Sequence, residues 1–267
     1  DFEQLARRTG SAFVHTAKID EHQEYLRDAG PLDIGISVNY PGIIPQSVID
    51  HFRLGILNAH GGDLPRYRGN ACQAWALLNG EERIGLCIHK MVGGELDSGD
   101  IVVRDYLPVD HNTRIGEVWN WMEGRVPSMF TEAVERLAED PGYILETQSR
   151  DPKDALRCYP RCPSDGRIDW TRSNLEILRL VNASSEPYAG AFAEFHGKTI
   201  TVWRGRLPSA DQENCCAVPG QVACVDSDAG DVTVITGEGK LVITEVEYDG
   251  RRDAPDRFVS SMRDRFE

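Results

Sequence analysis

The sequence predicts two parts: an α/β domain with a mostly parallel sheet over residues 1–149, then a small β-barrel over residues 150–267. Three observations predict this division. Short apolar runs alternate with helical segments in the first part, as in βαβ units. A polar stretch with three prolines, 150–166, then interrupts the pattern. Short β-like runs punctuated by Gly and Asp fill the rest, as in small barrels.

The first part contains apolar runs and helical patterns in turn. The run Ile34–Val38 is short and apolar throughout, as in a buried parallel strand. Asn70 and Thr113 precede helical patterns and are suitable N-caps. We expect strands at 12–16, 34–38, 55–58, 84–92 and 101–107. We expect helices at 20–29, from Pro45 through Phe52, at 70–79 and at 113–139.

The second part begins with one helical pattern, 173–183, and continues with β-like runs. The expected strands are AFAEF, TITVWRG, QVACV, DVTVIT and KLVITEVEY, beginning at Ala191. The chain opens with DFEQLARRTG, which resembles the middle of a helix, so we expect that a native start, with any leader, precedes these residues.

Composition restricts the function. The net charge is −14 and both halves are acidic, which argues against a protein that grips a long nucleic acid. Neither a long apolar stretch nor a signal sequence is visible, so we expect a cytoplasmic protein without a membrane span. Seven cysteines occur without a CxxC pair. Cys158, Cys162 and His196 form the most metal-like set, but reduced cytosolic cysteines are the better explanation, and we expect no metal.

Two segments carry the residues with chemical potential, 58–70 and 96–101. Asn58 and His60 end a buried strand, where open α/β sheets bind ligands, and alternation puts them on one side. Asp97 lies in a glycine-flanked turn after the next strand. An amide donor, an imidazole base and a carboxylate beside it suit acyl transfer to an amine. Spacing alone leaves open a structural histidine and an ordinary turn.

Other enzyme classes lack their motifs. The chain contains no GxSxG elbow, no Walker loop, no GxGxxG fingerprint and no HExxH zinc helix. Hydrolase, NTPase, dinucleotide and zinc-protease interpretations therefore lack support.

The paired motifs resemble those of 10-formyltetrahydrofolate-dependent formyltransferases. The resemblance is carried by Asn58-x-His60 with Leu64-Pro65 and Gly69, and by Leu96-Asp97-x-Gly99-Asp100-Ile101. It covers roughly residues 11–145 and implies a Rossmann-like catalytic domain. It also implies that Asn58, His60 and Asp97 are the catalytic trio.

The same resemblance implies the donor, 10-formyltetrahydrofolate, held by main-chain groups of two loops, with no metal. In this sequence the loops are Gly42-Ile43-Ile44 and Val92-Gly93-Gly94-Glu95-Leu96, with Tyr40 as a lining residue. One departure stands beside it: the given sequence starts after the family's opening strand and glycine-containing loop. We expect either that these residues precede the given sequence or that this is a truncated version, and substrate binding is in doubt.

The acceptor follows from a narrower resemblance. The stretch GGDLPRYRGNACQAWALLNGE is more similar to nucleotide-sugar N-formyltransferases than to the tRNA enzyme, and the second half resembles the OB-like carboxy-terminal barrel of both. The implied acceptor is a nucleotide-linked amino sugar of lipopolysaccharide O-antigen synthesis, with no nucleic acid and no membrane, in a homodimer. The suggested acceptor contacts, which equally suit a solvated loop, are Arg66, Tyr67, Arg68 and Asn70.

Three alternatives stay open. The nearest is methionyl-tRNA formyltransferase, and the second is hydrolysis of formyltetrahydrofolate by a similar trio. The third is a folate- or nucleotide-binding module without catalysis.

Overall fold

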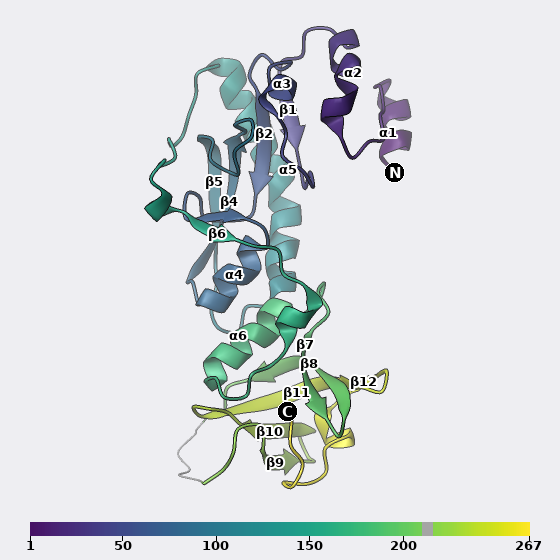
Figure 1. Cartoon of the computed structure of the whole chain (residues 1–267), viewed down its shortest axis with the longest axis vertical. Helices are drawn as coiled ribbons and strands as arrows, with labels where there is room; N and C mark the ends of the chain where they lie inside the picture. The colour runs from purple at the N-terminus through teal and green to yellow at the C-terminus, as the bar shows by residue number, and fades with distance from the viewer. Residues whose placement is uncertain (210–215) are drawn as a thin grey trace.

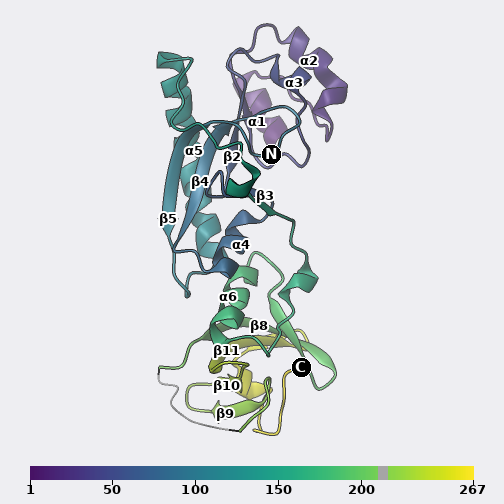
Figure 2. The same cartoon turned by 60° about the vertical axis from the view of Figure 1, so that its left-hand side comes forward.

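The computed structural model describes residues 1–209 and 216–267. The molecule is elongated, with an α/β part at one end and a β part at the other (Figure 1). The long helix α5 (Ile115–Glu139) runs along the α/β part, and the N- and C-termini lie in different parts (Figures 1 and 2).

The first sheet has four strands in the order β1-β2-β4-β5. They are β1 (Gly35–Ser37), β2 (Ile56–His60), β4 (Arg83–Lys90) and β5 (Ile101–Pro108). Only β1 and β2 pair in parallel, while β2–β4 and β4–β5 are antiparallel. The expectation of a mostly parallel sheet is therefore wrong for the described strands. The ten residues between β4 and β5 form no helix, and a short connection joins antiparallel neighbours.

Helix α5 covers one face of this sheet. Its buried Met129, Ala133 and Leu137 share a core with Leu57 of β2 and Leu86 of β4. Two shorter helices, α3 (Gln46–Ile49) and α4 (Cys72–Asn79), lie between the strands of this part. This packing fixes the strand ends that hold the candidate residues.

Both predicted helix caps are wrong. Helix α4 begins after Ala71, in the left-handed region, because the N–H of Asn70 is bonded to the carbonyl of Cys158. Helix α5 begins after Arg114, because the hydroxyl of Thr113 is engaged with Asp110 in the preceding turn.

The N-terminal segment packs beside β1. It forms α1 (Phe2–Thr9), the 3-10 turn η1 (Ile19–His22) and α2 (Gln23–Asp28). The expected strand at 12–16 is wrong, since these residues pair with no described strand. Strand β1 lies at the sheet edge, with Ile36 and Val38 exposed.

The second part contains α6 (Asn174–Ser184) and an antiparallel sheet, as expected. Ser173 caps α6 in a capping box with Glu176. The sheet runs β7-β8-β11-β10-β9, with β12 on β11. Its strands are β7 (Ala191–Phe195), β8 (Lys198–Arg206), β9 (Val222–Asp226), β10 (Asp231–Ile235), β11 (Lys240–Tyr248) and β12 (Arg251–Asp253), and the turn η4 (Pro255–Arg257) follows. These ladders form an open path, so closure into a barrel stays a prediction.

The polar stretch between the two parts is not an isolated linker, because one of its segments forms a strand that pairs with the first part. It contains η2 (Pro152–Asp154), β6 (Leu156–Cys158) and η3 (Pro163–Gly166). Strand β6 pairs in parallel with β3 (Tyr67–Gly69), which follows the predicted catalytic loop. Helix α4 also packs on α6. The boundary is thus held against the segment that carries the candidate site.

Candidate active site

The predicted catalytic residues converge at one place. Asn58 and His60 come from β2, and Asp97 comes from the loop between β4 and β5. A second histidine, His89, lies on β4 directly opposite Asn58. His60, His89 and Asp97 are largely buried, so their charges are poorly screened by water.

His60 is held by contacts on both ring nitrogens. Its Nε2 lies 2.7 Å from the carbonyl oxygen of Tyr67, which can only accept, so Nε2 carries the proton in the neutral ring. Nδ1 is then the basic nitrogen, 3.5 Å from Oδ2 of Asp97. Burial lowers the pKa of His60 below its ordinary value of 6.5, against the opposing charge of Asp97. His60 is therefore a neutral base near pH 7.

Asp97 is the carboxylate of the cluster. Burial raises its pKa, but the neighbouring His89 and His60 and the N–H of Gly69 outweigh burial and lower the pKa to about 2. The Gly69 N–H donates to Oδ2 at 2.9 Å. Asp97 is thus ionised near pH 7 and stabilises a proton arriving on His60.

His89 was missed by the sequence reasoning and orients Asn58. Its Nδ1 donates to the carbonyl of Lys90 at 3.0 Å, so Nε2 is free to accept. The amide nitrogen of Asn58 donates to that Nε2 at 3.2 Å. This bond fixes which way the amide faces and leaves its second hydrogen for a substrate oxygen. The available signal was a polar residue inside the apolar run GLCIHKM.

Hydrogen bonds from strand β5 hold the loop after His60 in place. Arg104 of β5 donates to Oδ1 of Asp63 at 2.6 Å and to the carbonyl of Leu64 at 2.8 Å. Tyr106 donates to the same carboxylate oxygen at 3.0 Å. A Cβ at Gly62 would lie 2.5 Å from Nε2 of His60 and 2.6 Å from the Tyr67 carbonyl oxygen, so only glycine allows their contact.

Two cavities meet at His60. The first, of about 170 Å³, contains Asn58, His60, His89 and Asp97. Pockets for drug-sized ligands measure roughly 300–1,000 Å³, so it accommodates part of a ligand. Its remaining lining is Ser37, Asn39, Tyr40, Gly42, Ile43, Ala59, Gly69, Asn70, Met91, Val92, Glu95 and Leu96. We call it the donor-side cavity because it contains most of the residues predicted to hold the folate.

The two predicted folate loops lie side by side. The N–H of Gly93 donates to the Gln46 side chain at 3.0 Å, which ties the loop of Val92–Leu96 to helix α3 after the loop of Gly42–Ile44. Ile43 is exposed into the cavity, whereas Ile44 is buried in the core with Val48. Gly93 and Gly94 do not line the cavity themselves.

The second cavity, of about 550 Å³, shares His60 and Asn70 with the first. We call it the acceptor-side cavity. Helix α5 contributes Trp119, Met122 and Glu123 to it. The boundary and the loop after α6 contribute Pro160, Arg161 and Tyr188, so both parts of the molecule line it.

The four predicted acceptor contacts separate in the structure. Asn70 lines both cavities. Arg66 pairs with Glu81 at 2.7 Å, and the buried Tyr67 donates its hydroxyl to the same carboxylate. Arg68 donates to Gln148 and to the Ser149 carbonyl. Of the four, Asn70 alone lines the donor-side or the acceptor-side cavity.

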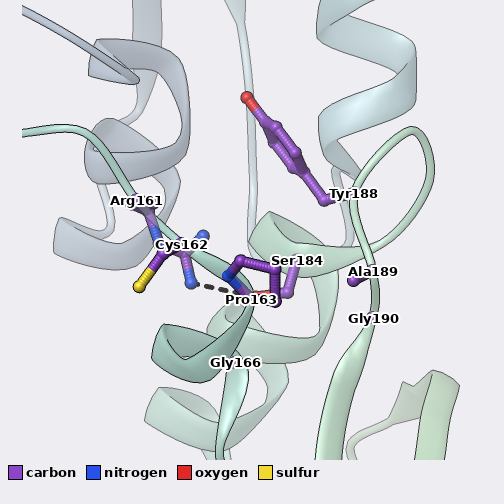
Figure 3. Close-up of a pocket in the computed structure, with 8 residues that line it drawn as sticks. All are labelled: Arg161, Cys162, Pro163, Gly166, Ser184, Tyr188, Ala189 and Gly190. Atoms are coloured by element: carbon purple, nitrogen blue, oxygen red, sulfur yellow. Dashed lines mark hydrogen bonds between the residues drawn. The ribbon is translucent and has the colours of Figure 1, made fainter.

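Arg161 and Tyr188, which the sequence reasoning missed, also line a small pocket of about 80 Å³ (Figure 3). Arg161 donates to the Ala183 carbonyl and the Ser184 hydroxyl, and no carboxylate among the described residues pairs with it. The Tyr188 ring rises from its loop with the hydroxyl farthest from Gly190 (Figure 3). Their contact with the site arises from tertiary packing, so no local pattern indicated it.

Two observations concern other site types. Among residues 1–209 and 216–267, no three His, Cys, Asp or Glu side chains cluster as metal ligands, and the cysteines there are free thiols. No helix of that part of the chain is long and apolar enough to cross a membrane. Cys215 lies outside the described residues.

A neutral base that lines two cavities, with an ionised carboxylate and an oriented amide beside it in one of them, supplies the parts of a group-transfer enzyme. Comparison with known proteins agrees. The family model "Formyl transferase" matches residues 11–134, and "Formyl transferase, C-terminal domain" matches residues 162–260. A methionyl-tRNA formyltransferase of Solibacter usitatus is 34% identical over 238 residues, which are 88% of this chain and 71% of that protein.

Two solved structures share the fold at low identity. HypX from Aquifex aeolicus with tetrahydrofolic acid is 22% identical with a TM-score of 0.59, covering 89% of this chain and 40% of that one. The N-formyltransferase of Helicobacter canadensis, in complex with folinic acid and dTDP-3-aminofucose, is 14% identical with a TM-score of 0.65, covering 90% and 80%. The chain therefore belongs to the formyl transferase family, whose enzymes depend on 10-formyltetrahydrofolate.

Proposed function

We propose that this formyltransferase moves the formyl group of 10-formyltetrahydrofolate to a primary amine through Asn58, His60 and Asp97. The observation that carries the proposal is the meeting of the two cavities at His60. A donor held on one side and an amine held on the other would face each other there. The lining of the donor-side cavity fits a folate, since it joins main-chain groups of two loops to the catalytic cluster.

Each of the three side chains has a separate role in the proposed transfer. His60 takes a proton from the attacking amine on Nδ1, and Asp97 stabilises the imidazolium that results. Asn58 donates its free amide hydrogen to the oxygen on which negative charge develops. The folate, when bound, supplies the formyl group. His60 then returns its proton to the departing nitrogen.

For the acceptor, the relatives favour the methionyl group of a charged tRNA over the amino sugar predicted from the sequence. The Solibacter relative that carries the tRNA name matches 88% of this chain. A local charge pattern is compatible: residues 150–167 hold five basic residues against three acidic ones in a chain of net charge −14. Arg161 of this stretch lines the acceptor-side cavity, where it would attract phosphate.

A nucleotide-linked amino sugar is the second candidate. The observation that favours it is the acidity of both halves of the chain, which opposes binding to a long polyanion. Either acceptor brings phosphate and a ring beside its amine.

The experiment is an assay of tetrahydrofolate release with methionylated initiator tRNA and a panel of UDP-, dTDP- and GDP-linked amino sugars. We expect turnover with the charged tRNA, with an apparent affinity that falls steeply as salt rises, because phosphate contacts release counterions. Turnover with one sugar and none with tRNA would establish the second candidate. Release of tetrahydrofolate and formate without any amine would instead indicate hydrolysis and overturn the proposed transfer.

A further inference from the structure

One buried hydroxyl beside the catalytic cluster has no assigned task. Ser37 of β1 is only 7% exposed, and its Oγ has no hydrogen-bond partner. A hydroxyl left buried and unpaired destabilises the fold, so it calls for an explanation. Ser37 is one of the residues that line the donor-side cavity, although its Oγ is itself buried.

Strand register places this hydroxyl next to Asn58. Ser37 and Asn58 are direct partners in the parallel pair β1–β2, and Asn58 and His89 are partners in β2–β4. Directly opposed residues on neighbouring strands point to the same face of a sheet. Ser37, Asn58 and His89 therefore form a row across three strands, with Asn58 in the middle.

The two outer members of the row differ in what they can offer. The Nε2 of His89 is occupied by the Asn58 amide. The Ser37 hydroxyl is unpaired but buried, and a change of its χ1 rotamer would turn it toward the cavity, where it can donate. A formyl oxygen in front of Asn58 has two lone pairs, so it can accept from the amide and from the hydroxyl together.

We propose that Ser37 is a second donor to the formyl oxygen, acting beside Asn58 on the charge that develops in the transition state. This inference rests on the proposed formyl transfer and adds a catalytic residue to it. The folate ring itself is held elsewhere in the cavity, by the loops at Gly42 and Val92.

The test replaces Ser37 by Ala and measures three quantities. Turnover at saturating substrates should fall roughly 10²-fold, as when an oxyanion donor is removed. The Kd of folate should stay within twofold, whereas the preference for 10-formylfolate over folate should fall at least threefold. The melting temperature should not fall, because the variant removes a polar atom that was buried without a partner.

Two further variants make the test specific. Ser37→Thr keeps a hydroxyl and should restore most of the turnover. Ser185→Ala removes another fully buried hydroxyl, one that donates to the Asn182 carbonyl at 2.9 Å. It should lower the melting temperature while leaving turnover within twofold.

Three results would overturn the inference. One is turnover of Ser37→Ala within threefold of the wild type. Another is an equal loss of affinity for folate and 10-formylfolate, which would assign the hydroxyl to the folate ring. The third is a lower melting temperature that accounts for the lost turnover. Because the formylfolate preference is read without an acceptor, it separates failure of this inference from failure of the proposed transfer.

Discussion

The two cavities that meet at His60 are built differently. The donor-side cavity is lined by the first part alone, from the ends of β1, β2 and β4 and the loops beside them. The acceptor-side cavity is about three times larger and takes Pro160, Arg161 and Tyr188 from the boundary and the loop after α6. In the proposed reaction, chemistry and donor binding would therefore depend on the first part, and acceptor choice would depend on both parts.

The loop that carries Tyr188 is braced between the two parts. Glu186 accepts from Arg114 at the start of α5, at 2.9 Å, and from Arg252 of β12. Rotation of the second part would move Tyr188 relative to His60. This difference predicts that changes at Asp97 or Gly62 lower turnover with every acceptor, whereas a change at Tyr188 weakens binding of the acceptor.

The largest effect is expected from Asp97→Asn. The amide oxygen can still accept from Gly69, but the charge that stabilises the His60 imidazolium is gone. The ratio kcat/KM should fall about 10²- to 10⁴-fold with any acceptor. Asp105→Asn, which breaks a half-buried pair with Arg125, is the matched control and should change kcat/KM less than twofold. A loss below tenfold for Asp97→Asn contradicts the assigned role.

Gly62→Ala should reduce turnover about 10²-fold through geometry alone, as a displacement of roughly 1 Å can do. The new methyl group would force apart His60 and the Tyr67 carbonyl. Gly124→Ala is the control, because a Cβ there meets nothing within 4 Å. Crystal structures of both variants would show whether the His60 ring has moved, and an unmoved ring with lost turnover would refute the explanation.

Tyr188→Ala should raise the acceptor KM about tenfold, since an aromatic platform for a ring contributes roughly 1–3 kcal/mol. It should leave kcat and the Kd of tetrahydrofolate within twofold. Tyr159→Ala removes a more exposed tyrosine that does not line either cavity, so it serves as the control. Steady-state kinetics with the identified acceptor measure this KM. Equal KM values for wild type and Tyr188→Ala would exclude a role for Tyr188 in acceptor binding.

The smallest effect is a shift in pH dependence. Only neutral His60 accepts a proton, so kcat/KM should rise with pH through the pKa of His60, which lies below 6.5. Asp97 raises that pKa by favouring the imidazolium. Its removal should therefore move the acidic limb of the kcat/KM profile of Asp97→Asn to lower pH. A shift to higher pH would mean that another group titrates.

The elements with strong local patterns could be predicted. Apart from the expected strand at 12–16, the strands predicted for the first part, the long helix and the strands predicted for the second part lie close to the expected ranges. The predicted cap at Asn70 failed where its N–H forms a tertiary hydrogen bond to the carbonyl of Cys158. The predicted cap at Thr113 failed because its hydroxyl bonds to Asp110 in the preceding turn. The predicted parallel direction of β5 beside β4 was wrong because the ten residues that join them form no crossover helix, and such a short connection favours an antiparallel pair.

The residues of the candidate site that lie within the two sequence motifs were predictable, and the others were not. Asn58, His60 and Asp97 lie within two short segments and converge as expected. Ser37, His89, Arg161 and Tyr188 belong to the site through strand register and domain packing. Arg66 and Tyr67 follow the motif in sequence, but their side chains turn toward Glu81 instead.

The central claim is that His60 drives transfer of the formyl group to an amine. The most direct measurement is a single turnover with 10-formyltetrahydrofolate labelled with ¹³C in the formyl group, followed by mass spectrometry of the acceptor. Wild-type enzyme should place the label on the acceptor amine within one turnover, and His60→Gln should bind folate equally but transfer about 10²- to 10⁴-fold more slowly. Label on the amine at similar rates in both proteins, or label in formate alone, would contradict the account.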